Sequence, residues 1–256
     1  MRLKTVCTSP ATASSGNQVL ANIVSAPAPG PARAQRIACP GSMGAVDSPF
    51  TVENVYKKED IGEEAMKRIS ALANPSPALA VVRKPDYTYV SDPADLMGLI
   101  KEGGLFLALD TIRDPGNLGT ILRIADWFGI KAVFATPDTV DLFNPKVVQA
   151  TMGAIFRVRL YYVDLPALSR IILKEGGKIY GTFLDGNNIY KSEIDNGSES
   201  ASVIVIGNES AGVSDEMAEM VSDRLYIPPY PADQPGSESL NAAIATAITV
   251  AEFRRR

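Results

Sequence analysis

The chain has 256 residues, 46% hydrophobic and 21% charged, which is enough to bury a sizeable core in one large or two modest domains. It contains no histidine and only two cysteines, Cys7 and Cys39, so it lacks the usual general base, every Ser-His or Cys-His nucleophile pair, and the makings of a disulfide framework or zinc site. The net charge of −4 gives no sign of a nucleic-acid partner. No apolar run reaches the roughly 18 residues of a membrane span. We therefore expect a soluble, cytoplasmic protein with no metal and no membrane contact.

The composition changes near residue 50. Residues 5–50 contain only three charged side chains, and Ala, Pro, Ser and Gly dominate, so no periodicity is evident and this stretch is atypical. Between Val52 and Lys84 the pattern predicts a strand ("VENVYKKED"), a short helix ("GEEAMKRISALA") and a buried strand ("PALAVVRKP"). A linker with a short helix follows. We therefore expect a small N-terminal domain over residues 1–99.

The region from residue 100 to 256 alternates strands and helices. Helices are predicted from Leu118 to Phe128, after the Asn144-Pro145 start signal, and from about Ser239 to Phe253. The other predicted elements, in chain order, are the strands "GLFLALD", "KAVFA" and "RVRLYY", the helix "LPALSRIILKEGG", the strands "KIYGTFL" and "SVIVIGN", the helix "SDEMAEMVS" and the strand "RLYIP". This alternation predicts a parallel α/β sheet. Ligands gather beyond the carboxyl ends of such strands, so the loops after Asp110, Gly207 and Pro228 are the candidate site.

The first of these loops opens the segment "DTIRDPGNLGTILRIADWFG", residues 110–129. Asn117 can cap the helix, whose free first-turn amides attract an anion or a ribose oxygen. Arg123 lies one turn after Gly119, and helical side chains lean toward the N-terminus, so its guanidinium is expected at the same end. The segment thus concentrates positive potential at the start of the helix. An ordinary capped helix with a surface arginine would have the same sequence.

The other two loops are also chemically unusual. In "VIVIGNESAGVSDEM" an apolar strand runs into Gly207, Glu209 and Gly212 before a helix that Ser214 is expected to cap, without the Lys-Ser or Lys-Thr of a Walker loop. In "LYIPPYPADQPGSESLNAAIATAITVAEF" a strand ends in a proline-rich loop. Stiff, donor-poor backbone of this kind suits a pocket for a flat ring. Each loop alone could be a plain surface turn.

Together, in this order, the three loops resemble the SpoU (TrmH-like) family of S-adenosylmethionine-dependent RNA ribose 2'-O-methyltransferases, in the SPOUT superfamily. The resemblance covers about residues 104–256: Asn117 and Arg123 keep the family's spacing, "GNESAG" stands in place of its Gly-x-Glu-x-x-Gly loop, and "SLN" follows an "IP" strand end. Residues 52–84 are more loosely similar to the second half of the family's small RNA-binding domain. Two departures are the missing basic helix in residues 1–50 and a longer loop between Ile227 and Leu240.

The resemblance implies a C-terminal parallel-sheet domain closed by a trefoil knot, with S-adenosylmethionine bent inside the knotted loops. It places Gly207, Ile227 and Leu240 against the cofactor. Around the reacting ribose of a tRNA or rRNA it places Asn117, Arg123, Glu209, Ser239 and Asn241. Arginine is a poor base, so we expect Arg123 to orient the adjacent phosphate and stabilise the developing alkoxide. The family also implies a homodimer, in agreement with the apolar and small residues around much of the last helix.

Three alternatives are weighed against this reading. A nucleotide-dependent oxidoreductase needs a Gly-x-Gly-x-x-Gly turn after the first strand and an acid about 20 residues later, and both are missing. A base-modifying SPOUT methyltransferase is expected to carry an acid where this chain has Arg123. A non-catalytic RNA-binding protein would not need all five polar residues of the predicted ribose site.

Overall fold

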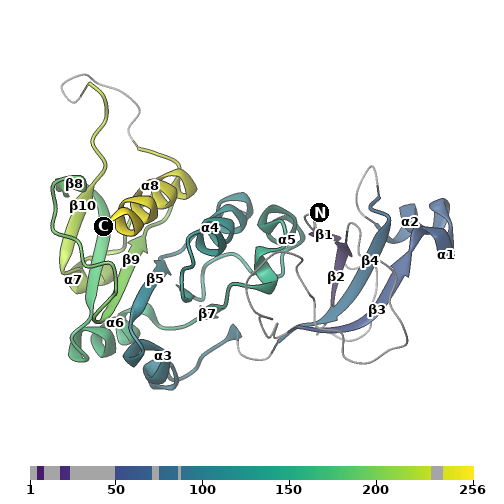
Figure 1. The fold of residues 1–256 in the computed structure, drawn as a ribbon, viewed down its shortest axis with the longest axis horizontal. Helices are drawn as coiled ribbons and strands as arrows, with labels where there is room; N and C mark the ends of the chain where they lie inside the picture. Colours follow the sequence, from purple (N-terminus) through teal and green to yellow (C-terminus); the bar gives the residue numbers. More distant parts are fainter. Residues whose placement is uncertain (1–4, 9–17, 24–49, 71–74, 86–87, 232–238) are drawn as a thin grey trace. The chain divides into compact units, whose positions relative to one another are not determined.

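The structure is a computed structural model that describes residues 5–8, 18–23, 50–70, 75–85, 88–231 and 239–256 (Figure 1). The chain forms two compact units. The first comprises residues 1–86 and 141–157, and the second comprises residues 87–140 and 158–256. Cys39 lies outside the described residues, as does much of the atypical stretch before residue 50.

The first unit contains a four-stranded antiparallel sheet in the order β1-β2-β4-β3. The strands are β1 (Thr5–Thr8), β2 (Gln18–Ile23), β3 (Thr51–Lys57) and β4 (Ala78–Arg83). Helices α1 (Lys58–Ile61) and α2 (Glu63–Ile69) lie between β3 and β4, and α5 (Pro145–Thr151) and the 3-10 helix η3 (Ala154–Phe156) belong to the same unit. Met66, Leu79 and Val81 form its small core. Strands β1 and β2 fall in the stretch where the sequence showed no periodicity.

The second unit is built on a six-stranded parallel sheet in the order β10-β8-β9-β5-β6-β7, as the alternation of strands and helices predicted. Its strands are β5 (Gly104–Leu109), β6 (Val133–Ala135), β7 (Leu160–Tyr162), β8 (Lys178–Asn188), β9 (Ala201–Ile206) and β10 (Asp223–Tyr226). Strand β8 is longer than predicted because, after a bulge, its last residues pair with β10. No helix among the described residues is long and apolar enough to cross a membrane.

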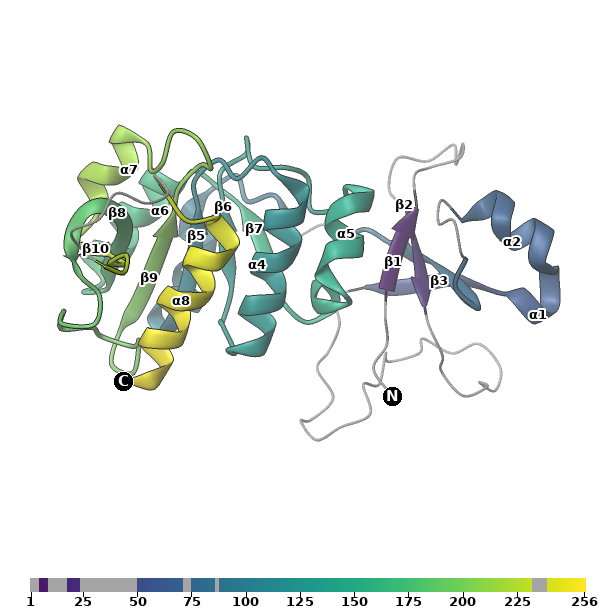
Figure 2. The same ribbon diagram turned by 90° about the horizontal axis from the view of Figure 1, so that it is seen from above.

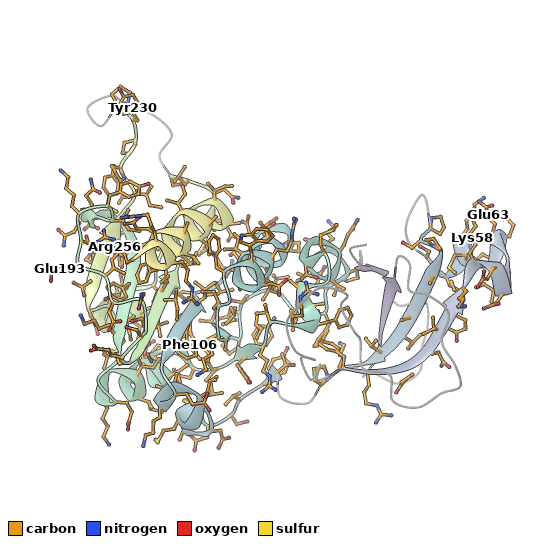
Figure 3. All side chains as sticks on the ribbon, viewed as in Figure 1. Lys58, Glu63, Phe106, Glu193, Tyr230 and Arg256 are labelled. Atoms are coloured by element: carbon orange, nitrogen blue, oxygen red, sulfur yellow. The ribbon has the colours of Figure 1, made fainter. Side chains whose placement is uncertain are left out.

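Helices cover both faces of this sheet (Figure 2). The helices are η2 (Pro93–Leu96), α3 (Met97–Lys101), α4 (Pro115–Trp127), α6 (Leu165–Lys174), α7 (Asp215–Met220) and α8 (Ala242–Arg255). Side chains of η2, α3, α6 and α7 pack into one large core with Phe106, Phe134 and other sheet residues (Figure 3). On the other face Phe253 of α8 packs edge-on against Tyr180, with 4.9 Å between ring centroids.

Three of the α-helices begin in the same way, with an Asp or Asn cap followed by proline in the first turn. The Asp114 carboxylate accepts from the Asn117 N–H at 2.7 Å, the Asn144 Oδ1 from Lys146 at 2.9 Å, and the Asp164 carboxylate from Ala167 at 2.9 Å. Proline loses nothing there, because first-turn N–H groups have no partner inside the helix. These caps fix where α4, α5 and α6 leave their preceding loops.

The end of α8 is tied to the rest of the second unit by arginines. Arg254 donates to the carbonyl oxygens of Phe128 at 2.9 Å and Gly129 at 2.7 Å, the two residues that follow α4. Glu252 is 6% exposed and accepts from Arg255 at 2.7 Å and Arg256 at 2.9 Å. Hydrogen bonding to Arg255, reinforced by Arg256, outweighs burial and lowers the pKa of Glu252 to about 2.

We expect Glu252→Gln to lower the free energy of unfolding by about 1–2 kcal/mol at neutral pH, allowing for the solvent screening of Arg255. Because folding lowers the pKa of Glu252, its bonds contribute fully to stability above about pH 4.5 and lose that contribution as the pH falls toward 2. The difference in free energy of unfolding between wild type and variant should shrink over the same pH range. Urea unfolding at several pH values measures it. Glu216→Gln, which removes an exposed 3.8 Å pair with Arg170, is the control, and an equal loss there would contradict the prediction.

Candidate active site

The loop after β5 has a strained start. Thr111 has φ of 62°, a conformation rarely adopted by β-branched residues. Its N–H donates to the Thr136 hydroxyl at 2.9 Å, and its carbonyl oxygen accepts from the Asn208 side-chain amide at 2.7 Å. Such conformations persist only where neighbours hold them, and they concentrate at functional sites. The loop thereby turns the backbone N–H groups of the next residues toward the loop after β9.

The prediction that Asn117 caps α4 is wrong. Asp114 is the cap, because it stands immediately before Pro115, while Asn117 lies inside the first turn with only 8% of its surface exposed. The Asn117 side chain is therefore free to face the other loops. The signal for the correct cap, Asp before Pro, was present in the sequence.

The loop after β9 is folded tightly on itself. Asn208 and Gly212 exchange backbone hydrogen bonds at 2.8 and 3.0 Å, and Gly212 has φ of +74°. A Cβ on Gly207 would come within 2.2 Å of the Gly212 carbonyl carbon, so only glycine fits at position 207. Ser214 caps α7, as predicted, by accepting from the Met217 N–H. The loop thus holds Glu209 in one place.

The Glu209 carboxylate accepts three hydrogen bonds from the segment that starts α4. The donors are the Arg113 N–H (3.3 Å), the Asp114 N–H (3.1 Å) and the Asn117 Nδ2 (3.0 Å). Burial acts to raise the pKa of Glu209, but the hydrogen bonds, led by that from Asn117, outweigh it and hold the pKa below its usual range. Glu209 is therefore an anion fixed against the N-terminal end of α4.

Asn241 joins this arrangement from the third loop. Its Nδ2 donates to the Asn117 Oδ1 at 2.8 Å, while its own Oδ1 accepts from the first N–H groups of α8 at 3.0 and 3.3 Å. A chain of hydrogen bonds thus runs from Asn241 through Asn117 to Glu209, and we call it the amide relay. It connects the three loops that the sequence singled out, at the carboxyl ends of the strands.

The remaining predicted residues surround the relay less directly. Arg123 is exposed on α4, and it makes no hydrogen bond or ion pair with any part of the chain that the structure describes. Ser239 and Leu240 are exposed immediately before Asn241, and Gly207 and Ile227 are half-buried. Beyond Ile227, Tyr230 is 99% exposed at the outer end of the described part of the long loop (Figure 3).

Sequence reasoning missed two residues that connect the first two loops. Asp110 is 3% exposed and its carboxylate accepts from the Ser214 N–H at 2.7 Å, and Asn208 donates to Thr111. Asp110 and Asn208 were visible as polar residues at strand ends, but their partners lie about a hundred residues away. Only the strand order places them together.

A comparison with known protein families identifies the family of this chain. Residues 104–251, more than half of the chain, match the SpoU rRNA Methylase family. The protein is a SpoU family member. The match spans the six strands, the amide relay and Arg123.

Individual relatives agree with this assignment. The SpoU chain is 34% identical over 194 residues to the 23S rRNA (guanosine(2553)-2'-O)-methyltransferase RlmP of Bacillus subtilis, covering 76% of this chain and 71% of that protein. Its fold is similar to a putative TrmH-family RNA methyltransferase from Porphyromonas gingivalis, at 41% identity and a TM-score of 0.63, over 74% and 70% of the two chains. It is also similar to an AdoMet-bound rRNA methyltransferase from Sinorhizobium meliloti, at 33% identity and a TM-score of 0.65, over 76% and 70%.

Proposed function

We propose that this SpoU protein transfers a methyl group from S-adenosylmethionine to a ribose 2'-hydroxyl of a structured tRNA or rRNA. The observation that carries the proposal is the amide relay, which gathers Asn117, Glu209 and Asn241 beside a helix whose exposed Arg123 has no partner among the described residues. The names of the similar proteins, a 23S rRNA 2'-O-methyltransferase and an AdoMet-bound rRNA methyltransferase, agree with this reaction.

The cofactor would be held by Gly207, Ile227 and Leu240. These residues suit an adenosine: Leu240 is apolar and 48% exposed, Ile227 is half-buried, and Gly207 offers only backbone groups. When bound, S-adenosylmethionine supplies a methyl group already activated by its sulfonium, so no metal is needed.

The protein's own residues must then position the ribose and stabilise charge. Arg123 presents a planar pair of donors, which suits the phosphate next to the reacting ribose and the oxyanion that develops on the 2'-oxygen. Ser239 and Asn241, at the start of α8, would contact the sugar. The relay fixes the orientation of the Asn117 amide, since its oxygen accepts from Asn241 and its nitrogen donates to Glu209.

The decisive test of this function uses unmodified total tRNA and rRNA with isotopically labelled S-adenosylmethionine, followed by mapping of the labelled nucleotide. Label on a ribose supports the proposal, and label on a base favours the base-modifying alternative. Activity should survive a chelator. Calorimetry with the cofactor and its demethylated product adds a second readout: binding of NADH in place of both would contradict the proposal.

The first unit, residues 1–86 with 141–157, would contribute to RNA binding, and the second unit would carry the reaction. The second unit begins at residue 87 rather than at the expected residue 100, because η2 and α3 pack into its core. We further propose that the segments around β8, β10 and α8 form the trefoil knot of the SPOUT superfamily, and that the protein acts in the cytoplasm. Support comes from family membership. Deletion of residues 1–86, which keeps η2 and α3 in the core of the second unit, should weaken RNA binding while leaving cofactor affinity in place.

A homodimer completes the proposal. Helices α4 and α8 each leave a large apolar side chain exposed, Trp127 at 75% and Ile244 at 51%, and we infer that a partner subunit covers them. We expect Ile244→Asp to convert a dimer to a monomer in light scattering at micromolar concentration. Leu173→Asp, on the opposite face of the sheet and 38% exposed, should leave the dimer intact. A wild-type monomer would remove the hypothesis.

A further inference from the structure

Asp110 is buried and is not used in the proposed chemistry, yet it bonds to both ends of the loop that carries Glu209, with its backbone at one end and its carboxylate at the other. The backbone N–H of Asp110 donates to the Ile206 carbonyl oxygen at 2.9 Å, where the loop begins. Its Oδ2 accepts from the Ser214 N–H at 2.7 Å, where the loop ends. With 3% of its surface exposed, Asp110 has little water available as an alternative partner.

The loop between these two anchors cannot shift at one end without disturbing the other. The backbone of Gly207 packs so closely on Gly212 and Val213 that no side chain fits between them. Ser214 directly follows this contact, and Asn208 is bonded to the Thr111 carbonyl oxygen at 2.7 Å. Displacement of Ser214 would therefore move Gly207 and loosen the three hydrogen bonds that Glu209 accepts.

We propose that Asp110 is a positioning residue for methyl transfer, acting through the Gly207–Ser214 loop rather than on the substrate. This inference rests on the proposed function. What Asp110 supplies is a correctly placed acceptor for the Ser214 N–H, so an asparagine, which keeps one side-chain oxygen, can replace it, and an alanine cannot. Small misplacements of a preorganised group are costly in rate, up to about 100-fold for 1 Å.

The test compares Asp110→Ala, Asp110→Asn and a matched control, Asp164→Ala, which removes another aspartate acceptor of a backbone N–H from the far face of the sheet. We expect Asp110→Ala to lower the single-turnover methylation rate at least about 10-fold and to weaken S-adenosylmethionine binding, with RNA affinity within about 2-fold. Asp110→Asn should stay within about 3-fold of wild type in rate. Asp164→Ala should lower the Tm without changing the rate.

Hydrogen–deuterium exchange of the segment 207–214 gives a readout that does not depend on activity. Faster exchange in Asp110→Ala, with recovery in Asp110→Asn, supports the positioning role. Unchanged exchange and an unchanged methylation rate in Asp110→Ala would overturn it. So would equal losses of rate in Asp110→Ala and Asp110→Asn, or a loss of rate in Asp164→Ala as large as that in Asp110→Ala. A wild-type protein that transfers no methyl group would contradict the proposed function instead.

Discussion

Replacing Arg123 with alanine is expected to reduce single-turnover methyl transfer at least about 100-fold, the scale of losing one preorganised donor to a developing anion. Arg123→Lys should recover little, because a point charge on a flexible stem does not reproduce the planar fork of a guanidinium. Arg123 is exposed and bonds to none of the described residues, so its loss should leave the Tm and the cofactor affinity near wild type. Single-turnover methylation and calorimetry on the same samples separate these effects.

A matched control is Arg170→Ala, which removes an exposed arginine of α6 whose 3.8 Å ion pair with Glu216 is solvent-screened. It should methylate RNA like wild type. If Arg123→Ala also methylates at a near wild-type rate, or loses cofactor binding and fold together, the segment from Asp110 to Gly129 is a structural turn and the placement of the active centre is wrong.

The second large effect concerns the centre of the amide relay. Asn117→Asp places a carboxylate oxygen where an N–H donor now lies 3.0 Å from the Glu209 carboxylate, in a side chain that is 8% exposed. Repulsion between two close carboxylates should cost about 3 kcal/mol or more, which corresponds to a loss of roughly 100-fold or more in methyl transfer. The Tm should fall as well, because the repulsion from Glu209 acts only in the folded chain, whereas the bond from Asn241 can persist on an aspartate oxygen.

The pH dependence of this variant has a definite sign. Hydrogen bonds now lower the pKa of Glu209, whereas a second carboxylate beside it must raise the pKa of the pair. Lowering the pH would let the pair share a proton, so the rate of Asn117→Asp relative to wild type should rise as the solution becomes more acidic. Asn144→Asp is the control, since aspartate caps α5 as well as asparagine does. A relative rate that does not change with pH would contradict the expected repulsion.

Local signals explain how much of the fold was predictable. The Asn144-Pro145 start of α5, the Ser214 cap of α7 and the apolar strands β5 and β9 all appear in short stretches of sequence, and the structure confirms them. The strand order does not, because pairing of β5 with β9 depends on contacts across about a hundred residues. The α4 start was misjudged by three residues, since two possible caps, Asp114 and Asn117, compete and proline decides between them.

In the candidate site, too, some features could be predicted from local sequence and others could not. The three loops could be selected from sequence because parallel sheets gather ligands at one edge, and the structure does bring Asn117, Glu209 and Asn241 together. The direction of each amide, the strain at Thr111 and the burial of Asp110 could not be read from neighbouring residues. These three features depend on how strands far apart in the sequence pair, and on which polar atoms this pairing buries.

The amide relay has a consequence for the order of events in biosynthesis. Asn117 and Glu209 are separated by 92 residues, and Asn117 and Asn241 by 124. Contacts of such long range form late, after much of the chain has become compact. While the chain emerges from the ribosome, Asn117 therefore gains Glu209 as a possible partner first, and Asn241 only when the start of α8 has been made. The complete relay therefore forms only in a chain whose second unit has been synthesised as far as the start of α8.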